Sequence, residues 1–268
     1  MVRWAHHFRR AISSFLSPSR SSRLLRSTTP SFTPWRTKKN GWITISKSRG
    51  TFSGFCSHQK RRRSTGFRSA ALMCRPAVAI ADVSGKGVPA SLIMAICRSV
   101  LRAEAARNPS PADVLRKVNR QLYPDIREDM FISMAYLILD HQRNGVVLAR
   151  AGHDAPLLYK QQSQSVTPVK PPGMVVGIDS GNVFDRLTVD FGVLLERDDC
   201  LVLYTDGVTE TLNTEGDEFG LERMMQSVRA RANDGAQAIV KKIIEDVRDF
   251  TGSEPQNDDI TVIAIRKT

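Results

Sequence analysis

Acidic residues are missing from the front of this 268-residue chain. Its first 81 residues contain no aspartate or glutamate but carry 17 lysines and arginines. The whole chain has 39 basic and 27 acidic residues, so the part after residue 81 holds 22 basic residues and all 27 acids. The net charge of +12 therefore comes from the front, and the folded part is expected to be mildly acidic.

Cysteine is scarce, and hydrophobic runs are short. The four cysteines form no C-x-x-C pair and no metal-ligand spacing, which excludes a zinc-ribbon type of site. Cys97 and Cys200 lie in apolar runs, so we expect reduced core residues in a cytoplasmic protein. No apolar run approaches the ~18 residues of a membrane span, and the N-terminus lacks the clean apolar core of a secretory signal.

The basic front, residues 1–75, is rich in arginine and serine and shows no sustained period of 2 or 3.6 residues. Such a segment buries too little apolar surface to offset its ordering entropy, so we expect most of it to be disordered. A targeting peptide or a nucleic-acid-binding arm would share this composition, although the aromatic residues do not form a stacking surface. We favour a third interpretation, that the segment is not a native part of the domain formed by residues 76–268.

The most informative stretch is Ala79 to Ala90, which reads AIADVSGKGVPA. The apolar residues before Asp82 predict a short buried strand. Two glycines then permit a tight turn, and Pro89 suits the first turn of a helix. Asp82 is therefore expected at a strand edge, beside a loop whose exposed amides suit a metal ion or a phosphate.

Hydrophobic periodicity predicts the remaining elements. Helices are expected at residues 89–106, 221–231 and 236–250, with a further one opened by Ser110, and strands at 131–139, 146–151, 157–159, 187–191, 201–205 and 260–265. Residues 161–172 are expected to form a surface loop. Strands in hairpin order and helices in pairs favour an α+β layered domain over a doubly wound parallel sheet.

Two further carboxylates share the placement of Asp82. Asp206 follows one predicted strand, and Asp258, with Asp259 beside it, precedes another. If the last strand runs antiparallel to the others, the three acids meet at one edge of the sheet. Crowded carboxylates repel one another unless a cation lies between them, and oxygen ligands select Mg²⁺ or Mn²⁺. Two such ions can activate a water for attack on a phosphate.

Four ordered blocks carry a family resemblance: DVSGKGVPA at 82–90, AGH at 151–153, LYTDGVTE at 203–210 and DDIT at 258–261. They resemble the signature blocks of the bacterial SpoIIE/RsbU-type serine phosphatases, a branch of the metal-dependent PP2C (PPM) protein phosphatases. The resemblance implies a PP2C-like β-sandwich flanked by helices, and two Mn²⁺ or Mg²⁺ ions. It implies a protein serine/threonine phosphatase that acts on a phosphorylated STAS-type anti-sigma-factor antagonist, with an upstream sensor or activator as a further partner. Neither nucleic acid nor membrane is an expected partner.

By the same resemblance, Asp82 corresponds to the carboxylate that bridges both ions, and Val83 to a backbone carbonyl ligand. Asp206 and Asp258 correspond to the ligands of the second ion. Asp82, Asp206 and Asp258 are thus the expected catalytic residues, while Asp259 is expected to order its loop.

Two neighbouring side chains leave alternatives open. His153 could donate a proton or hold its loop by hydrogen bonds, and the bend around it favours the second role. Lys86 could meet a phosphate or be a solvated loop residue.

The family also has a Gly-Gly-Asp-x-Tyr-Asp-like strand upstream of Asp82, which the acid-free front lacks. We therefore expect an N-terminally truncated domain without its first strand or strands. Two hypotheses follow: an active phosphatase, or a catalytically impaired remnant that binds a partner without hydrolysing anything. A third, nucleic-acid binding through the front, predicts steep salt dependence.

Overall fold

The computed structural model describes residues 40–46, 51–59, 69–73, 77–85, 87–106, 108–140, 144–256 and 258–268, and for the first three of these ranges it gives the path of the backbone. Lys86 and most of residues 1–75 lie outside these ranges. The role of Lys86 and the expected disorder of the front therefore stay predictions.

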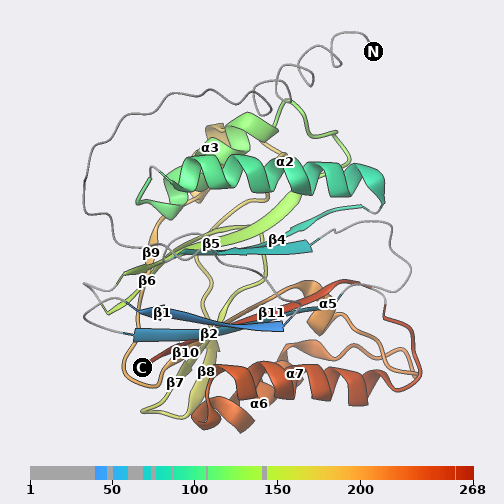
Figure 1. Ribbon diagram of the computed structural model, residues 1–268. Coiled ribbons are helices and arrows are strands. Elements are labelled where there is room, and N and C mark those ends of the chain that lie inside the picture. The colour runs from blue at the N-terminus through green and yellow to red at the C-terminus, as the bar shows by residue number, and fades with distance from the viewer. Residues whose placement is uncertain are drawn as a thin grey trace, which may run out of the picture. The chain divides into compact units, whose positions relative to one another are not determined.

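The described strands form two antiparallel sheets (Figure 1). Sheet A has the order β1-β2-β11-β10-β7-β8, formed by Asn40–Ser46, Thr51–Gln59, Ile260–Lys267, Cys200–Tyr204, Leu157–Lys160 and Ser165–Pro168. Sheet B has the order β3-β4-β5-β6-β9, formed by Ser69–Met73, Ala77–Val83, Ile132–Asp140, Gly145–Ala151 and Phe191–Leu194. The prediction of an α+β layered domain is confirmed.

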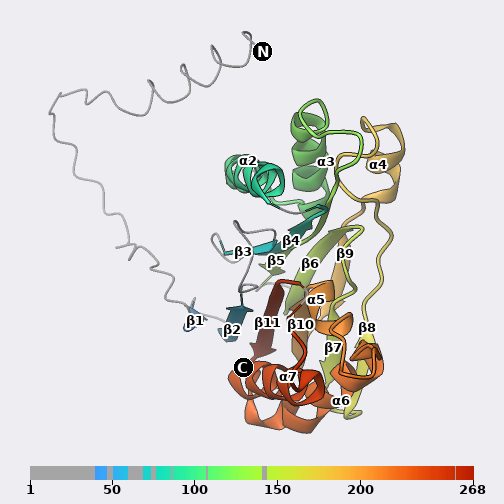
Figure 2. The ribbon, with the colours of Figure 1, turned by 90° about the vertical axis from the view of Figure 1, so that its right-hand side faces the viewer.

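Helix pairs cover the outer faces of the two sheets, as Figures 1 and 2 show. α2 (Val88–Ala105) and α3 (Pro111–Leu122) lie on sheet B, and α6 (Gly220–Arg231) and α7 (Ala236–Thr251) lie on sheet A. Three shorter elements are α4 (Asn182–Leu187), α5 (Asp206–Thr209) and η1 (Ala232–Asp234). Among the described helices, none combines the length and the hydrophobicity that a membrane span requires.

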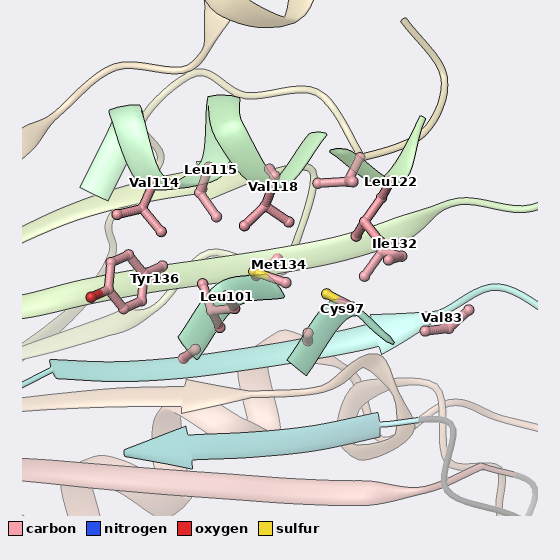
Figure 3. Close-up of a cluster of buried hydrophobic side chains, with 14 of the residues drawn as sticks. Val83, Cys97, Leu101, Val114, Leu115, Val118, Leu122, Ile132, Met134 and Tyr136 are labelled. Atoms are coloured by element: carbon pink, nitrogen blue, oxygen red, sulfur yellow. The ribbon is translucent and has the colours of Figure 1, made fainter. Parts of the chain in front are cut away.

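Three apolar layers hold this arrangement together: one lies between the sheets, one under α2 and α3, and one under α6 and α7. The layer between the sheets joins β4, β5, β6 and β9 to β10 and β11, through buried side chains that include Val78, Ile80, Leu137, Leu148, Leu201, Leu203, Ile263 and Ile265. The layer under α2 and α3 is shown in Figure 3, where side chains such as Cys97, Leu115 and Met134 meet between helix and sheet. Because β10 is covered on both faces, all five of its residues are buried, which explains its continuous apolar sequence.

Two predicted elements differ from the structure. Residues 161–172 contain the edge strand β8, and the strand expected at 187–191 is instead the end of α4 and the start of β9. The side chain of Asp179 accepts hydrogen bonds from the backbone N–H groups of Gly181, Val183 and Phe184 at 2.9–3.0 Å, and so starts α4. The capping role of this aspartate was not recognised in the sequence.

Three strands come from residues 1–75, where none was expected. β2 pairs with both β1 and β11, and β3 pairs with β4. Strand ladders are held by backbone hydrogen bonds, which nearly any residue can supply, so a segment without clear alternation can still pair. The domain boundary at residue 76 stays a prediction.

Candidate functional site

The first predicted ligand, Asp82, lies near the end of β4 and is 8% exposed. Its neighbours in the ladder are Ser69 on β3 and Ser133 on β5. The loop after β4 is fixed to the start of β5, because Ser84 N donates to Phe131 O at 2.9 Å and Ser84 Oγ accepts from Phe131 N at 2.7 Å. Asp82 thus stands beside an anchored loop. Val83, the other residue expected here, ends the strand and is fully buried.

Asp206 and Asp258 lie at one end of sheet A. β10 and β11 are antiparallel, so the end of one strand adjoins the start of the other. Asp206 begins α5 and is separated from β10 by Thr205 alone, and its Oδ1 accepts from Gly207 N at 2.8 Å. Asp258 precedes β11, and its Oδ1 accepts from Asp259 N at 2.6 Å.

The two segments touch at Gly207. A Cβ atom built at this position would lie 2.5 Å from the carbonyl oxygen of Asp259 and 3.3 Å from Cβ of Asp258. Only glycine therefore permits this approach of the chain after Asp206 to the Asp258 segment.

Two more acids belong to this end of the molecule, and no role for either was identified in the sequence. The pKa of Asp154 is raised to about 6, first by burial and then by the negative charges of Asp206 and Glu210, while Arg150 opposes the rise. Glu210 follows α5, and its N–H donates to Asp206 O at 2.8 Å. Its spacing of four residues from Asp206, one helical turn, was the available signal. Asp154 had none beyond its place after His153.

His153 connects the region of Asp82 to these acids. It is 3% exposed, and its Nδ1 lies 2.8 Å from Oγ of Ser133, the ladder neighbour of Asp82. Its carbonyl accepts from Arg150 Nη1 at 2.6 Å. Burial lowers the pKa of His153 to about 4. A neutral, buried imidazole fits the loop-holding role better than that of a proton donor at neutral pH.

The three predicted ligands are thus brought to the same end of the sandwich, but not into one preformed cage. In Figure 1 the tip of β4 and α5 lie at the right-hand end of the two sheets, which faces the viewer in Figure 2. Among the described residues, no three Asp, Glu, His or Cys side chains are close enough to hold one metal ion. The sharing of ions by Asp82, Asp206 and Asp258 stays a prediction.

The donor chemistry at this end suits a divalent cation. Carboxylates gather around Asp206: the pKa of Asp154 is raised chiefly by burial, and the negative charges of Asp206 and Glu210 add to the rise. A hard cation with oxygen ligands would relieve the repulsion among these carboxylates.

Comparison with known proteins places the chain in a family. The family model described as Stage II sporulation protein E (SpoIIE) matches residues 75–268. The chain is 30% identical over 192 residues to phosphoserine phosphatase RsbU of Bacillus subtilis, covering 71% of this chain and 55% of RsbU. It is 26% identical over 219 residues to protein IcfG of Synechocystis, covering 70% and 33%. The chain therefore spans about half the length of RsbU and a third of IcfG.

Solved structures show the same fold. The SiaA-PP2C domain of Pseudomonas aeruginosa has a TM-score of 0.67 at 20% identity, over 80% of this chain and 85% of that one. The PP2C phosphatase domain of SpoIIE from Bacillus subtilis has a TM-score of 0.66 at 16% identity, over 84% and 71%. The catalytic domain of PstP, solved with two manganese ions, has a TM-score of 0.60 at 11% identity, over 81% and 98%. The two sheets and their helices thus form a PP2C-type fold.

Proposed function

Since this chain belongs to the SpoIIE family, we propose that it is a metal-dependent protein phosphatase that hydrolyses phosphoserine or phosphothreonine on a regulatory protein. The substrate class comes from the relative RsbU, which is named a phosphoserine phosphatase. A STAS-type substrate, an upstream sensor or activator and a cytoplasmic location are parts of the same proposal.

The observation that supports this function is the gathering of acids at one end of the sandwich. The segments of Asp206 and Asp258 are in contact there, and the charges of Asp206 and Glu210 contribute to the raised pKa of Asp154. Asp82 is connected to this group of acids through its ladder neighbour Ser133, which contacts His153. We propose that this end binds two Mn²⁺ or Mg²⁺ ions.

In this proposal the acids divide into two groups. Asp82 and the Val83 carbonyl provide donors from sheet B, and Asp206 and Asp258 provide donors from sheet A. Bound ions would supply an activated water and neutralise the phosphate charge. The chain itself holds the carboxylates in place: Asp206 and Asp258 each accept a backbone N–H at one oxygen, which restricts the side-chain orientation.

Hydrolysis of p-nitrophenyl phosphate and of a phosphoserine-bearing STAS protein with Mn²⁺ tests the proposal. Asp82→Asn and Asp206→Asn should each abolish turnover, because each removes a charged donor while keeping its size. Asp249→Asn, at an exposed position of α7, is the matched control and should retain activity. Turnover that is indifferent to chelator and to both site variants would refute the proposal.

A second candidate is a binding protein that no longer hydrolyses phosphate. It is favoured by the lack of a preformed group of three metal-binding side chains among the described residues. Calorimetric titration separates the two functions: an absence of Mn²⁺ binding at millimolar concentration supports the binding protein, and saturable binding supports the phosphatase.

A further inference from the structure

Thr205 lies between β10 and Asp206, and its side-chain hydroxyl does not cap the helix that follows it. It precedes α5 in an extended conformation, with φ −95° and ψ 155°, and is fully buried. A threonine at this position commonly caps its own helix through the hydroxyl group. Here the side chain makes no such cap bond. The hydroxyl is instead directed at the neighbouring segment.

The Thr205 hydroxyl bonds to the Asp258 segment on both sides of Ile260. Its Oγ1 donates to the carbonyl oxygen of Asp259 at 3.0 Å and accepts from the N–H of Thr261 at 2.9 Å. The backbone N–H of Thr205 adds a bond to Thr261 O at 3.1 Å. One side chain thus continues the β10–β11 ladder past the point where β10 ends.

Thr205 and Gly207 flank Asp206, and both meet the carbonyl of Asp259. The hydroxyl of Thr205 bonds to this oxygen, and the bare Cα of Gly207 lets the oxygen come close. Asp206 is therefore held from both sides against the segment that carries Asp258. Its position relative to Asp258 is set by these contacts of the chain itself.

We propose that Thr205 is a positioning residue that fixes the spacing between the carboxylates of Asp206 and Asp258. This inference rests on the proposed metal-binding function. Removing the hydroxyl lets the two segments move apart, so divalent ions bind more weakly. Partners that orient metal ligands typically change affinity by roughly 10- to 100-fold.

The test compares Thr205→Val, which keeps the shape and loses the hydroxyl, with Thr205→Ser, which keeps the hydroxyl and loses the methyl group. Mn²⁺ affinity of the full chain is measured by calorimetry. Thr205→Val should bind Mn²⁺ at least about tenfold more weakly, and Thr205→Ser within about twofold of wild type. The matched control is Thr188→Val, at another fully buried threonine, whose Oγ1 has no hydrogen-bond partner among the described residues. It should leave Mn²⁺ affinity unchanged.

Amide exchange of the metal-free proteins provides a readout that does not involve the ion. The N–H of Thr261 should exchange faster in Thr205→Val than in wild type, and as in wild type in Thr205→Ser. Equal Mn²⁺ affinity of Thr205→Val and wild type overturns the positioning role while the proposed function stands. If Thr205→Val does not fold, loss of Mn²⁺ affinity in Thr205→Ser overturns the role of the hydroxyl. A wild-type chain that binds no Mn²⁺ overturns the proposed function and this inference with it.

Discussion

His153 is a residue that folding keeps uncharged. Its pKa falls from 6.5 to about 4 because the ring is buried. Above pH 6.5 the ring is neutral in the folded and the unfolded chain, so it does not affect their balance. Below this pH the unfolded chain takes up the proton first, and the folded state loses stability until the pH reaches about 4.

We therefore expect the metal-free protein to lose up to about 3 kcal/mol of stability through His153 as the pH falls across this interval. His153→Asn keeps a polar group near the position of Nδ1 but does not titrate, so its loss over the same interval should be smaller. Denaturant unfolding of both proteins at several pH values measures the difference. Parallel pH profiles would contradict the assignment.

The ionised form of Asp154 is disfavoured in the folded protein. Its pKa is raised from 3.8 to about 6, first by burial and then by the charges of Asp206 and Glu210, so at pH 7 folding places an ionised group in a partly buried, negatively charged environment. Without metal, Asp154→Asn should stabilise the protein at pH 7, on the order of 1 kcal/mol because the group is partly screened by solvent. Thermal unfolding with chelator present measures the gain. The exposed Asp125→Asn serves as control, and a gain of the same size there would point to net charge instead.

Individual residues differed in how far the sequence could locate them. The strand-end positions of Asp82, Asp206 and Asp258 could be predicted because each residue adjoins a continuous apolar run that marks a strand. Their role as metal ligands stays a prediction. Asp154 and Glu210 have no such marker, since the proximity of Asp154 to Asp206 arises from the packing of separate segments. The hydroxyl of Thr205 was equally hidden, because its partners lie more than fifty positions away.

At the scale of elements, a strand that is buried on both faces can be predicted from the sequence, whereas a weakly buried strand cannot. β10 is buried throughout and reads as an apolar run, whereas β9 buries only Val193 among four residues. α4 depends on the side chain of Asp179, which hydrophobic periodicity does not detect. The weakly buried edge elements were therefore misplaced.

The same contrast predicts the cost of truncating leucines. Leu203 on β10 is 1% exposed in the layer between the sheets, while Leu194 on β9 is 69% exposed. Leu203→Ala should reduce the free energy of unfolding by about 2–5 kcal/mol, and Leu194→Ala by less than about 0.5 kcal/mol. Denaturant unfolding of the two variants tests this. Similar losses would mean that the layer between the sheets is not the main core.

At the scale of the whole molecule, acids from both sheets reach the same end of the sandwich. If they bind a divalent ion, the ion should stabilise the folded state. At a Mn²⁺ concentration 100 times the dissociation constant, the gain is about 2.7 kcal/mol. We expect Mn²⁺ to raise the melting temperature of the wild-type chain and EDTA to reverse the rise. Asp206→Asn should show a much smaller rise, and an undiminished one would remove Asp206 from the site.

The layered class was predictable, because hairpin order and paired helices are local features of the sequence. The front of the chain was not. Its strands β1, β2 and β3 join the sheets through backbone pairing with β11 and β4, which composition does not reveal.

The place of β11 has a consequence for how the protein folds. Its two ladder partners are β10 and β2, and β2 is about 200 positions earlier in the chain. The β2–β11 ladder can form only after a very large loop has closed, which is entropically costly and kinetically slow. Sheet B and its helices, made mostly of sequence neighbours, can form earlier. Asp82, on β4, would then be in place before sheet A packs against sheet B and brings Asp206 and Asp258 to the same end of the sandwich. Any metal site shared by the two sheets would therefore form late in folding.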